Sequence, residues 1–181
     1  MKNIMYLIII IILAATALYL TNKPSKTTAD LDSGMFRIAD SLIAEIHLSD
    51  HKKDLILKRT DNNWVVNNKD KRPADEKHVK VLLSFLSDFS VYNVISENPE
   101  KLENYRVGTD GTNILVKLTD GSEVRFIAGK DNRSMSNTFY RQFNSDKILT
   151  GTPFPRRDLP DDLEGWVKKE SGQKNISPPD P

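Results

Sequence analysis

The chain of 181 residues contains no cysteine. Disulfide bonds, thiolate zinc sites, thiol catalysis and a lipid-modified cysteine are therefore all excluded. A domain without such links depends on its hydrophobic core for stability. The length is that of one folded domain of ordinary size.

The chain also lacks an excess of charge of either sign. It has 26 Lys and Arg residues against 25 Asp and Glu residues, which gives a formal net charge of +1. Proteins that bind nucleic acid are usually distinctly basic. We therefore expect no nucleic-acid partner.

Catalytic signatures are missing as well. The sequence has neither a nucleophile elbow nor a glycine-rich phosphate loop. His47 and His51 are four residues apart, as two metal ligands on one helix would be. The local pattern, however, is a strand running into a turn, where the two rings need not converge. The sequence therefore predicts no enzyme activity, no catalytic residue, no metal site and no cofactor.

The longest apolar run extends from Ile4 to Leu20 and carries no charge. As a helix it would span about 25 Å, at the short end of what crosses a bilayer. Tyr6 and Tyr19 lie near its ends, where aromatic rings favour the membrane interface. The run predicts a single transmembrane anchor over residues 1–20, with membrane lipid as the partner of residues 4–20.

A cleaved signal peptide is the alternative interpretation of this run. Lys2 supplies a positive N-terminal region, and Ala15-Thr16-Ala17 resembles a cleavage site. The apolar run continues to Leu20, which favours an uncleaved anchor. Basic residues on its two sides are nearly balanced and do not decide the orientation. We expect a cell-membrane protein. The resemblance described below favours an extracytoplasmic (periplasmic) C-terminal body.

Polar segments flank the predicted body, which covers residues 35–167. Residues 21–34 lack an apolar period and are predicted to be a tether that reaches about 20 Å from the bilayer. Residues 168–181 are polar and contain Pro178, Pro179 and Pro181. This segment is predicted to be disordered, or to order only on a partner.

Most of the body shows apolar residues at every second position. This pattern is typical of strands with one buried and one solvated face, and therefore of an antiparallel sheet. The expected inward positions are Ala44, Ile46 and Leu48; Leu55 and Leu57; Ile114, Val116 and Leu118; and Val124, Phe126 and Ala128.

Two of these runs are interrupted by turn residues. Asp120-Gly121 and Asp61-Asn62 each predict a β-hairpin. The stretches around the two turns, 56–66 and 115–125, share Lys, Thr and Asp at the same positions without a gap. Either one hairpin unit was duplicated, or two hairpins converged on the same turn chemistry.

One segment has the period of a helix. Its apolar residues lie three or four positions apart, so they form a single stripe. They are Val79, Leu82, Leu83, Leu86 and Phe89. Pro73 is expected to end the preceding strand, and Asp75 to cap the helix or lie in its first turn. A second, short helix is possible from Leu159 to Trp166.

The sequence thus predicts an α+β fold. An N-terminal transmembrane helix is followed by an antiparallel-sheet body of β-hairpins with one main amphipathic helix. We expect Trp64 to pack the sheet core against that helix, and Trp166 to anchor the last ordered segment to the body. A contact with another subunit is the functional alternative for both tryptophans.

The order of several short motifs resembles the family known as domain of unknown function (DUF) 4340, over roughly Phe36 to Trp166. The motifs are Trp64-Val65-Val66; Ala74-Asp75 before Leu82, Leu83 and Leu86; Tyr105-Arg106-Val107; Val116-Lys117-Leu118 before Gly121; Phe126-Ile127-Ala128-Gly129; and Tyr140-Arg141. The family usually has glycine after the tyrosine, where this chain has Arg106. The resemblance implies a body tethered outside the cytoplasm by one helix, in some members associated with ABC-type transporter systems of the gliding-motility kind. It implies no catalytic residues.

Two functions follow as hypotheses. The first is a non-enzymatic, single-pass membrane protein that serves as an accessory or scaffolding subunit of a larger, transporter-associated membrane complex. The alternative is a module that binds a small molecule or glycan between the helix and the hairpins. The expected contact residues are Trp64, Tyr105, Tyr140, Arg141 and Trp166.

Overall fold

The computed structural model describes residues 37–61, 63–67 and 70–169. The predicted anchor and tether, and residues 170–181 of the predicted tail, lie outside these ranges. None of the helices within them is long and apolar enough to cross a membrane.

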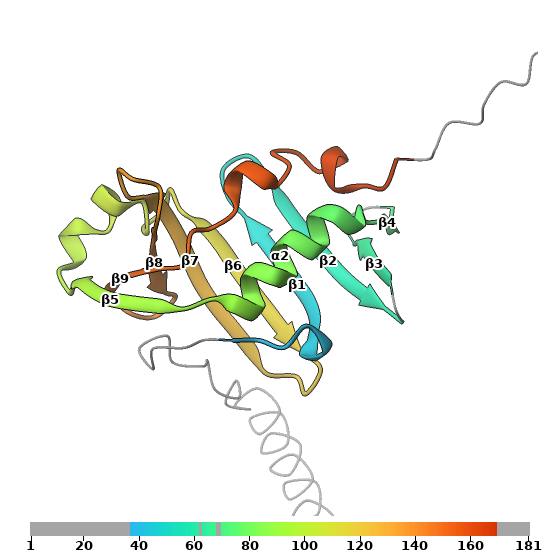
Figure 1. The fold of residues 1–181 in the computed structure, drawn as a ribbon, viewed down its shortest axis with the longest axis horizontal. Helices are drawn as coiled ribbons and strands as arrows, with labels where there is room; N and C mark the ends of the chain where they lie inside the picture. Colours follow the sequence, from blue (N-terminus) through green and yellow to red (C-terminus); the bar gives the residue numbers. More distant parts are fainter. Residues whose placement is uncertain (1–36, 62, 68–69, 170–181) are drawn as a thin grey trace, which may run out of the picture.

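The described residues form one antiparallel sheet of nine strands with few helices, as the period-two pattern predicts (Figure 1). The strands are β1 (Ile43–Ser49), β2 (Asp54–Thr60), β3 (Asn63–Val66), β4 (Arg72–Pro73), β5 (Val91–Ser96), β6 (Thr112–Leu118), β7 (Glu123–Asp131), β8 (Thr138–Gln142) and β9 (Ile148–Gly151). Their order across the sheet is β4-β3-β2-β1-β6-β7-β8-β9-β5. Strands β4 and β5 are therefore the two edges.

The predicted amphipathic helix is α2 (Glu76–Asp88). The Asp75 carboxylate accepts hydrogen bonds from the backbone N–H groups of Lys77 (2.9 Å) and His78 (3.4 Å), which caps the first turn. The predicted stripe is buried, and Phe85 is buried with it.

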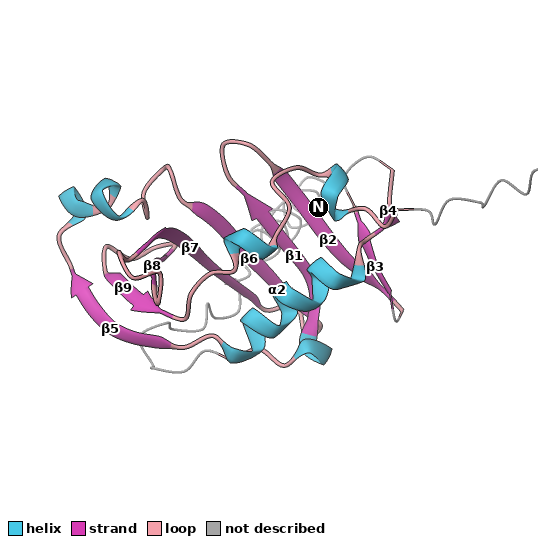
Figure 2. Ribbon diagram, turned by 45° about the horizontal axis from the view of Figure 1, so that its top comes forward, coloured by secondary structure: helices cyan, strands magenta, loops and turns pink. Residues whose placement is uncertain are grey.

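Helix α2 covers one face of the sheet and connects its two edges (Figures 1 and 2). It follows β4 at one edge and leads into β5 at the other. The N-terminal half of α2 therefore lies near β3. Its C-terminal half joins an aromatic cluster with the strands at the far end, made of Phe85, Phe89, Phe126, Tyr140 and Phe154.

Both predicted hairpins are present. Strands β2 and β3 pair with Thr60 opposite Asn63, and Asp61, which follows Thr60, has φ 54°. Strands β6 and β7 are joined by a longer turn, in which Gly121 has φ 82°. A positive φ is the conformation for which glycine is suited. The two similar sequences thus form turns of different length.

Two local predictions are wrong. Ala44 is not an inward position, because a β-bulge between Ile43 and Glu45 shifts the register and places Ile43 in the core instead. Pro73 does not stop the strand that precedes it, because β3 already ends at Val66; Pro73 is instead the last residue of the short edge strand β4, opposite Val65. Proline is tolerated there because an edge strand needs no N–H on its outer side.

The other face of the sheet has a smaller core of its own. Val107, Ile127 and Ile148 are buried there, beneath the segment that contains η3 (Pro99–Lys101) and η4 (Glu103–Tyr105). Ile127 points to this face because its neighbours in β7, Phe126 and Ala128, point to α2.

The C-terminal segment returns to the beginning of α2. The backbone of Asp75 donates to Trp166 O (2.8 Å), and that of Lys168 donates to Pro73 O (2.9 Å). In place of the possible short helix from Leu159 to Trp166, the structure has one 3₁₀ turn of three residues, η6 (Glu164–Trp166). Two further 3₁₀ turns are η5 (Arg156–Asp158), which precedes that range, and η2 (Asp40–Leu42), which precedes β1.

Candidate functional site

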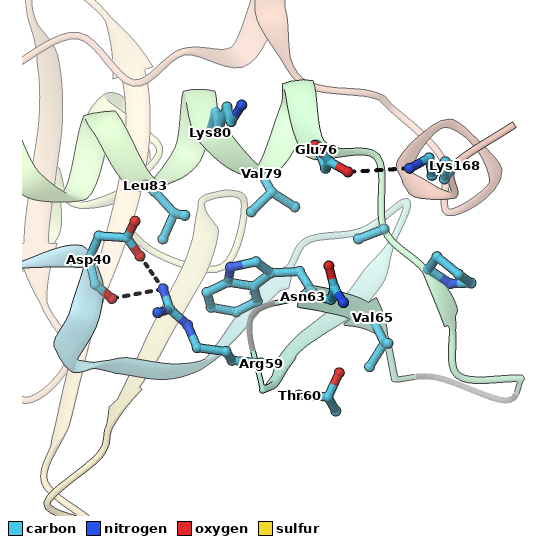
Figure 3. Close-up of a pocket in the computed structure, with 13 residues that line it drawn as sticks. Asp40, Arg59, Thr60, Asn63, Val65, Glu76, Val79, Lys80, Leu83 and Lys168 are labelled. Carbon is cyan, nitrogen blue, oxygen red and sulfur yellow. Dashed lines mark hydrogen bonds and ion pairs between the residues drawn. The ribbon is translucent and has the colours of Figure 1, made fainter.

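A concave surface with an aromatic lining lies between α2 and the β2–β3 hairpin (Figure 3). It has a volume of about 650 Å³. We call it the Trp64 groove. Its lining residues are Asp40, Arg59, Thr60, Asn63, Trp64, Val65, Pro73, Ala74, Glu76, Val79, Lys80, Leu83 and Lys168.

Four separate segments of the chain build the Trp64 groove, at positions 40, 59–65, 73–83 and 168. Val79 and Leu83 point from α2 toward the hairpin, where Arg59 lies (Figure 3). The half-buried Trp64 packs against the main core, and the Arg59 guanidinium lies 4.9 Å from the centre of its ring. Trp64 therefore packs the sheet against the helix, as predicted.

Charged groups surround this apolar floor. Arg59 donates hydrogen bonds to the carboxylate of Asp40 and, at 2.9 Å, to its backbone oxygen. Lys168 Nζ lies 3.2 Å from Glu76 Oε1. Among the described residues, neither the indole N–H of Trp64 nor the ammonium group of Lys80 has a hydrogen-bond partner. The groove thus combines an aromatic and aliphatic floor with two available donors.

A second surface lies at the opposite end of the sheet, on edge strand β5. Tyr92, Val94 and Ile95 are 50%, 49% and 43% exposed. Only three other large hydrophobic side chains of the described residues are so exposed, and they are scattered: Leu42, Met135 and Phe143. A run of exposed apolar residues on an open strand edge can pair with another strand.

The charge around β5 has one sign. Residues 81–100 contain three acidic residues, Asp88, Glu97 and Glu100, and no lysine, arginine or histidine. All three carboxylates are exposed. The β5 edge is therefore an apolar strand with acidic flanks.

The predicted contact residues do not meet in one place. Trp64 is the one among them that lines the groove. Tyr105 and Arg141 lie together at the smaller core instead: Tyr105 packs edge-on against Phe139 at 4.6 Å, and Arg141 Nε donates to Val107 O at 2.7 Å. A shared ligand pocket with Trp64 is therefore not formed.

Tyr140 and Trp166 are fully buried. The Tyr140 hydroxyl donates to Thr152 O at 2.6 Å, and burial raises the pKa of this phenol well above its usual range. Trp166 Nε1 donates to Pro160 O at 3.3 Å, so the ring anchors the C-terminal segment. Both side chains stabilise the interior, and neither presents a surface to a partner.

The histidines are likewise separate. His47 Nε2 lies 2.6 Å from Glu45 Oε1, whereas His51 Nε2 lies 2.9 Å from Asp110 Oδ1. Over the described ranges, no group of three or more His, Cys, Asp or Glu side chains could hold a metal ion.

The sequence interpretation missed β5 and most of the groove. Val91–Ser96 is rich in β-branched and aromatic residues, which is a signal for a strand. The absence of basic residues from position 81 to position 100 was also visible in the sequence. No local sequence pattern could have predicted that Lys80 and Lys168 line the same groove as Trp64, because the three residues come from distant segments.

A family model described as domain of unknown function (DUF4340) matches residues 64–171. This match covers more than half of the chain. Comparisons with curated proteins and with solved structures gave no match.

Proposed function

The chain belongs to the DUF4340 family, and we propose that it is a non-enzymatic accessory or scaffolding subunit of a larger membrane complex. In this proposal residues 4–20 anchor the chain in the membrane and the described body lies outside the cytoplasm. The family resemblance favours a complex of the transporter type. The body would act through contact with other subunits.

One observation carries this proposal, the open edge of β5 with its exposed Tyr92, Val94 and Ile95. Such an edge binds by strand addition: main-chain hydrogen bonds give affinity, and alternate side chains give specificity. The opposite edge is less suited, because β4 has two residues and one of them is Pro73, which has no N–H.

The acidic flanks indicate the partner. A second copy paired antiparallel on β5 would bring its Asp88 to the end that carries Glu97 and Glu100 of the first, and like charges across a strand pair are destabilising. We therefore expect a strand from a different subunit, apolar at alternate positions and with Lys or Arg at its ends.

The test is site-specific photocrosslinking in the full chain within its own membranes. A crosslinker at position 94 should capture a membrane-complex subunit, and one at position 42 should not. Leu42 is a matched control because it is 48% exposed, against 49% for Val94. Mass spectrometry of the captured peptide should identify a strand with basic ends.

Val94→Lys extends the test. A lysine on an open edge opposes strand addition, so complex recovered in mild detergent should fall about tenfold, a loss of about 1.4 kcal/mol in binding. Leu42→Lys should leave recovery unchanged. A full chain that migrates as a monomer and gives no crosslink at position 94 would contradict the proposal.

A second candidate function is binding of a small molecule or glycan in the Trp64 groove. The observation in its favour is the groove volume of about 650 Å³, which lies in the range of ligand pockets. Titration with candidate glycans should then change the fluorescence of Trp64, and a set of glycans without effect would count against it.

A further inference from the structure

We propose that the proline-containing segment of residues 176–181 binds in the Trp64 groove of the same chain. This inference concerns a different surface from β5 and does not rest on the proposed function. It commits the groove to one occupant, the sequence Ile-Ser-Pro-Pro-Asp-Pro.

The described chain leaves the body at the rim of the Trp64 groove. Lys168 lines the groove, donates its backbone N–H to Pro73 O at 2.9 Å, and pairs with Glu76 at 3.2 Å. Pro73 and Glu76 line the same groove. Lys168 therefore lies on the rim of the groove, and only Lys169 separates it in the sequence from residue 170.

The proline-containing segment also matches the groove in length. The lining residues of α2 run from Glu76 to Leu83, about 10 Å along the helix axis. Four residues in a polyproline II conformation, such as 178–181, cover about 12 Å. The eight residues before them, 170–177, can reach about 25 Å when extended, which is ample for a return to the groove.

The groove and the proline-containing segment are also chemically complementary. Proline has no N–H, so a proline-rich segment presents mainly carbonyl acceptors. The groove offers the two available donors, Trp64 Nε1–H and Lys80 Nζ, beside an aromatic and aliphatic floor. Grooves lined by aromatic rings bind proline-rich segments in this way. Asp180 supplies a carboxylate for Lys80.

Linkage within one chain makes even weak binding effective. A short flexible connection gives an effective concentration of about 1 mM. A segment that binds in trans with a Kd of about 0.1 mM would then be docked about 90% of the time in the intact chain.

Fluorescence quenching by acrylamide tests the inference, because the chain has two tryptophans and they differ in access. Trp166 is fully buried, whereas Trp64 is half-buried in the groove. We compare the full chain in nanodiscs with a chain that ends at Lys169. If the segment is docked about 90% of the time and shields Trp64 while docked, its removal should raise the Trp64 quenching constant by up to about tenfold.

Matched variants separate docking from a general change in stability. Replacing Pro178, Pro179 and Pro181 with serine in the full chain should reproduce the truncation. Lys80→Ala should raise quenching, whereas Lys77→Ala should not, because Lys77 is exposed on the same helix but does not line the groove.

A peptide of residues 170–181, added to the truncated chain, should restore protection, and a scrambled peptide should not. The inference is overturned if truncation leaves the quenching constant unchanged. It is also overturned if protection depends on protein concentration, which would indicate a second copy in the groove. Equal protection by the scrambled peptide would be a third contradiction.

Discussion

At the scale of single residues, Arg106 has a backbone conformation that suits glycine. It follows Tyr105, and its φ of 55° and ψ of 35° are left-handed. Its side chain is exposed. The turn therefore keeps the conformation that suits glycine, although the residue that occupies it is not glycine.

We expect Arg106→Gly to stabilise the fold by up to about 1 kcal/mol. The left-handed conformation costs an L-residue about 1–2 kcal/mol, and the greater freedom of glycine when unfolded offsets about 0.5–1 kcal/mol of this gain. Urea unfolding measures the difference. Arg106→Ala keeps the unfavourable φ and should stay within about 0.5 kcal/mol of the wild type. A glycine variant less stable than the alanine variant would contradict this explanation.

A second residue, Glu45, makes the free energy of unfolding depend on pH. Lys117 Nζ and His47 Nε2 lie 2.8 Å and 2.6 Å from its Oε1. Burial alone would raise the pKa of the Glu45 carboxyl, but the hydrogen bonds from Lys117 and His47 outweigh it and lower that pKa below the usual value of 4.5. The ionised carboxylate is thus favoured in the folded state.

Because the pKa of Glu45 is lower in the folded state than in the unfolded state, its carboxylate stabilises the fold above pH 4.5. This contribution is lost as the pH falls through the pKa of the folded state. We expect this contribution to be about 1 kcal/mol. As the pH falls from 7 to well below 4.5, Glu45→Gln should therefore lose up to about 1 kcal/mol less stability than the wild type in urea unfolding. Lys117→Met should also reduce the pH dependence. The same pH dependence in all three proteins would exclude a role for this carboxylate.

At the scale of elements, the sequence predicted those helices and strands that have one buried face and one solvent-exposed face. Helix α2 and strands β2, β6 and β7 have such a pattern, and each was predicted. Strand β9 was missed because all four of its residues are buried, with Ile148 in the smaller core and Leu149 in the main one. A strand covered on both faces shows no alternation.

Strand β5 was missed for the opposite reason. Its four central residues are all exposed, so burial imposes no period on them. Its pairing with β9 joins segments more than 50 residues apart, and alternation predicts that a strand exists but not which strand it pairs with. The same limit applies to the candidate sites. Trp64 was predicted from its place after a turn, whereas its neighbours in the groove depend on the tertiary fold.

At the scale of the whole molecule, the family match and the folded unit have different boundaries. The match begins at Trp64, but β1 and β2 precede it and lie inside the sheet. Strand β1 is hydrogen-bonded to β2 on one side and to β6 on the other. The matched region alone would therefore expose β6 and lack part of the main core.

We expect a fragment of residues 64–171 not to fold, and a fragment of residues 37–169 to unfold cooperatively. The shorter fragment loses five fully buried side chains: Ile43, Ile46, Leu48, Leu55 and Leu57. At about 1.5–3 kcal/mol each, their loss amounts to about 10 kcal/mol, as much as the whole stability of a typical domain. Urea unfolding followed by near-UV circular dichroism distinguishes the two fragments. A cooperative transition in 64–171 would mean that β1 and β2 are an addition to a complete domain, whereas its absence would place them in the folding unit.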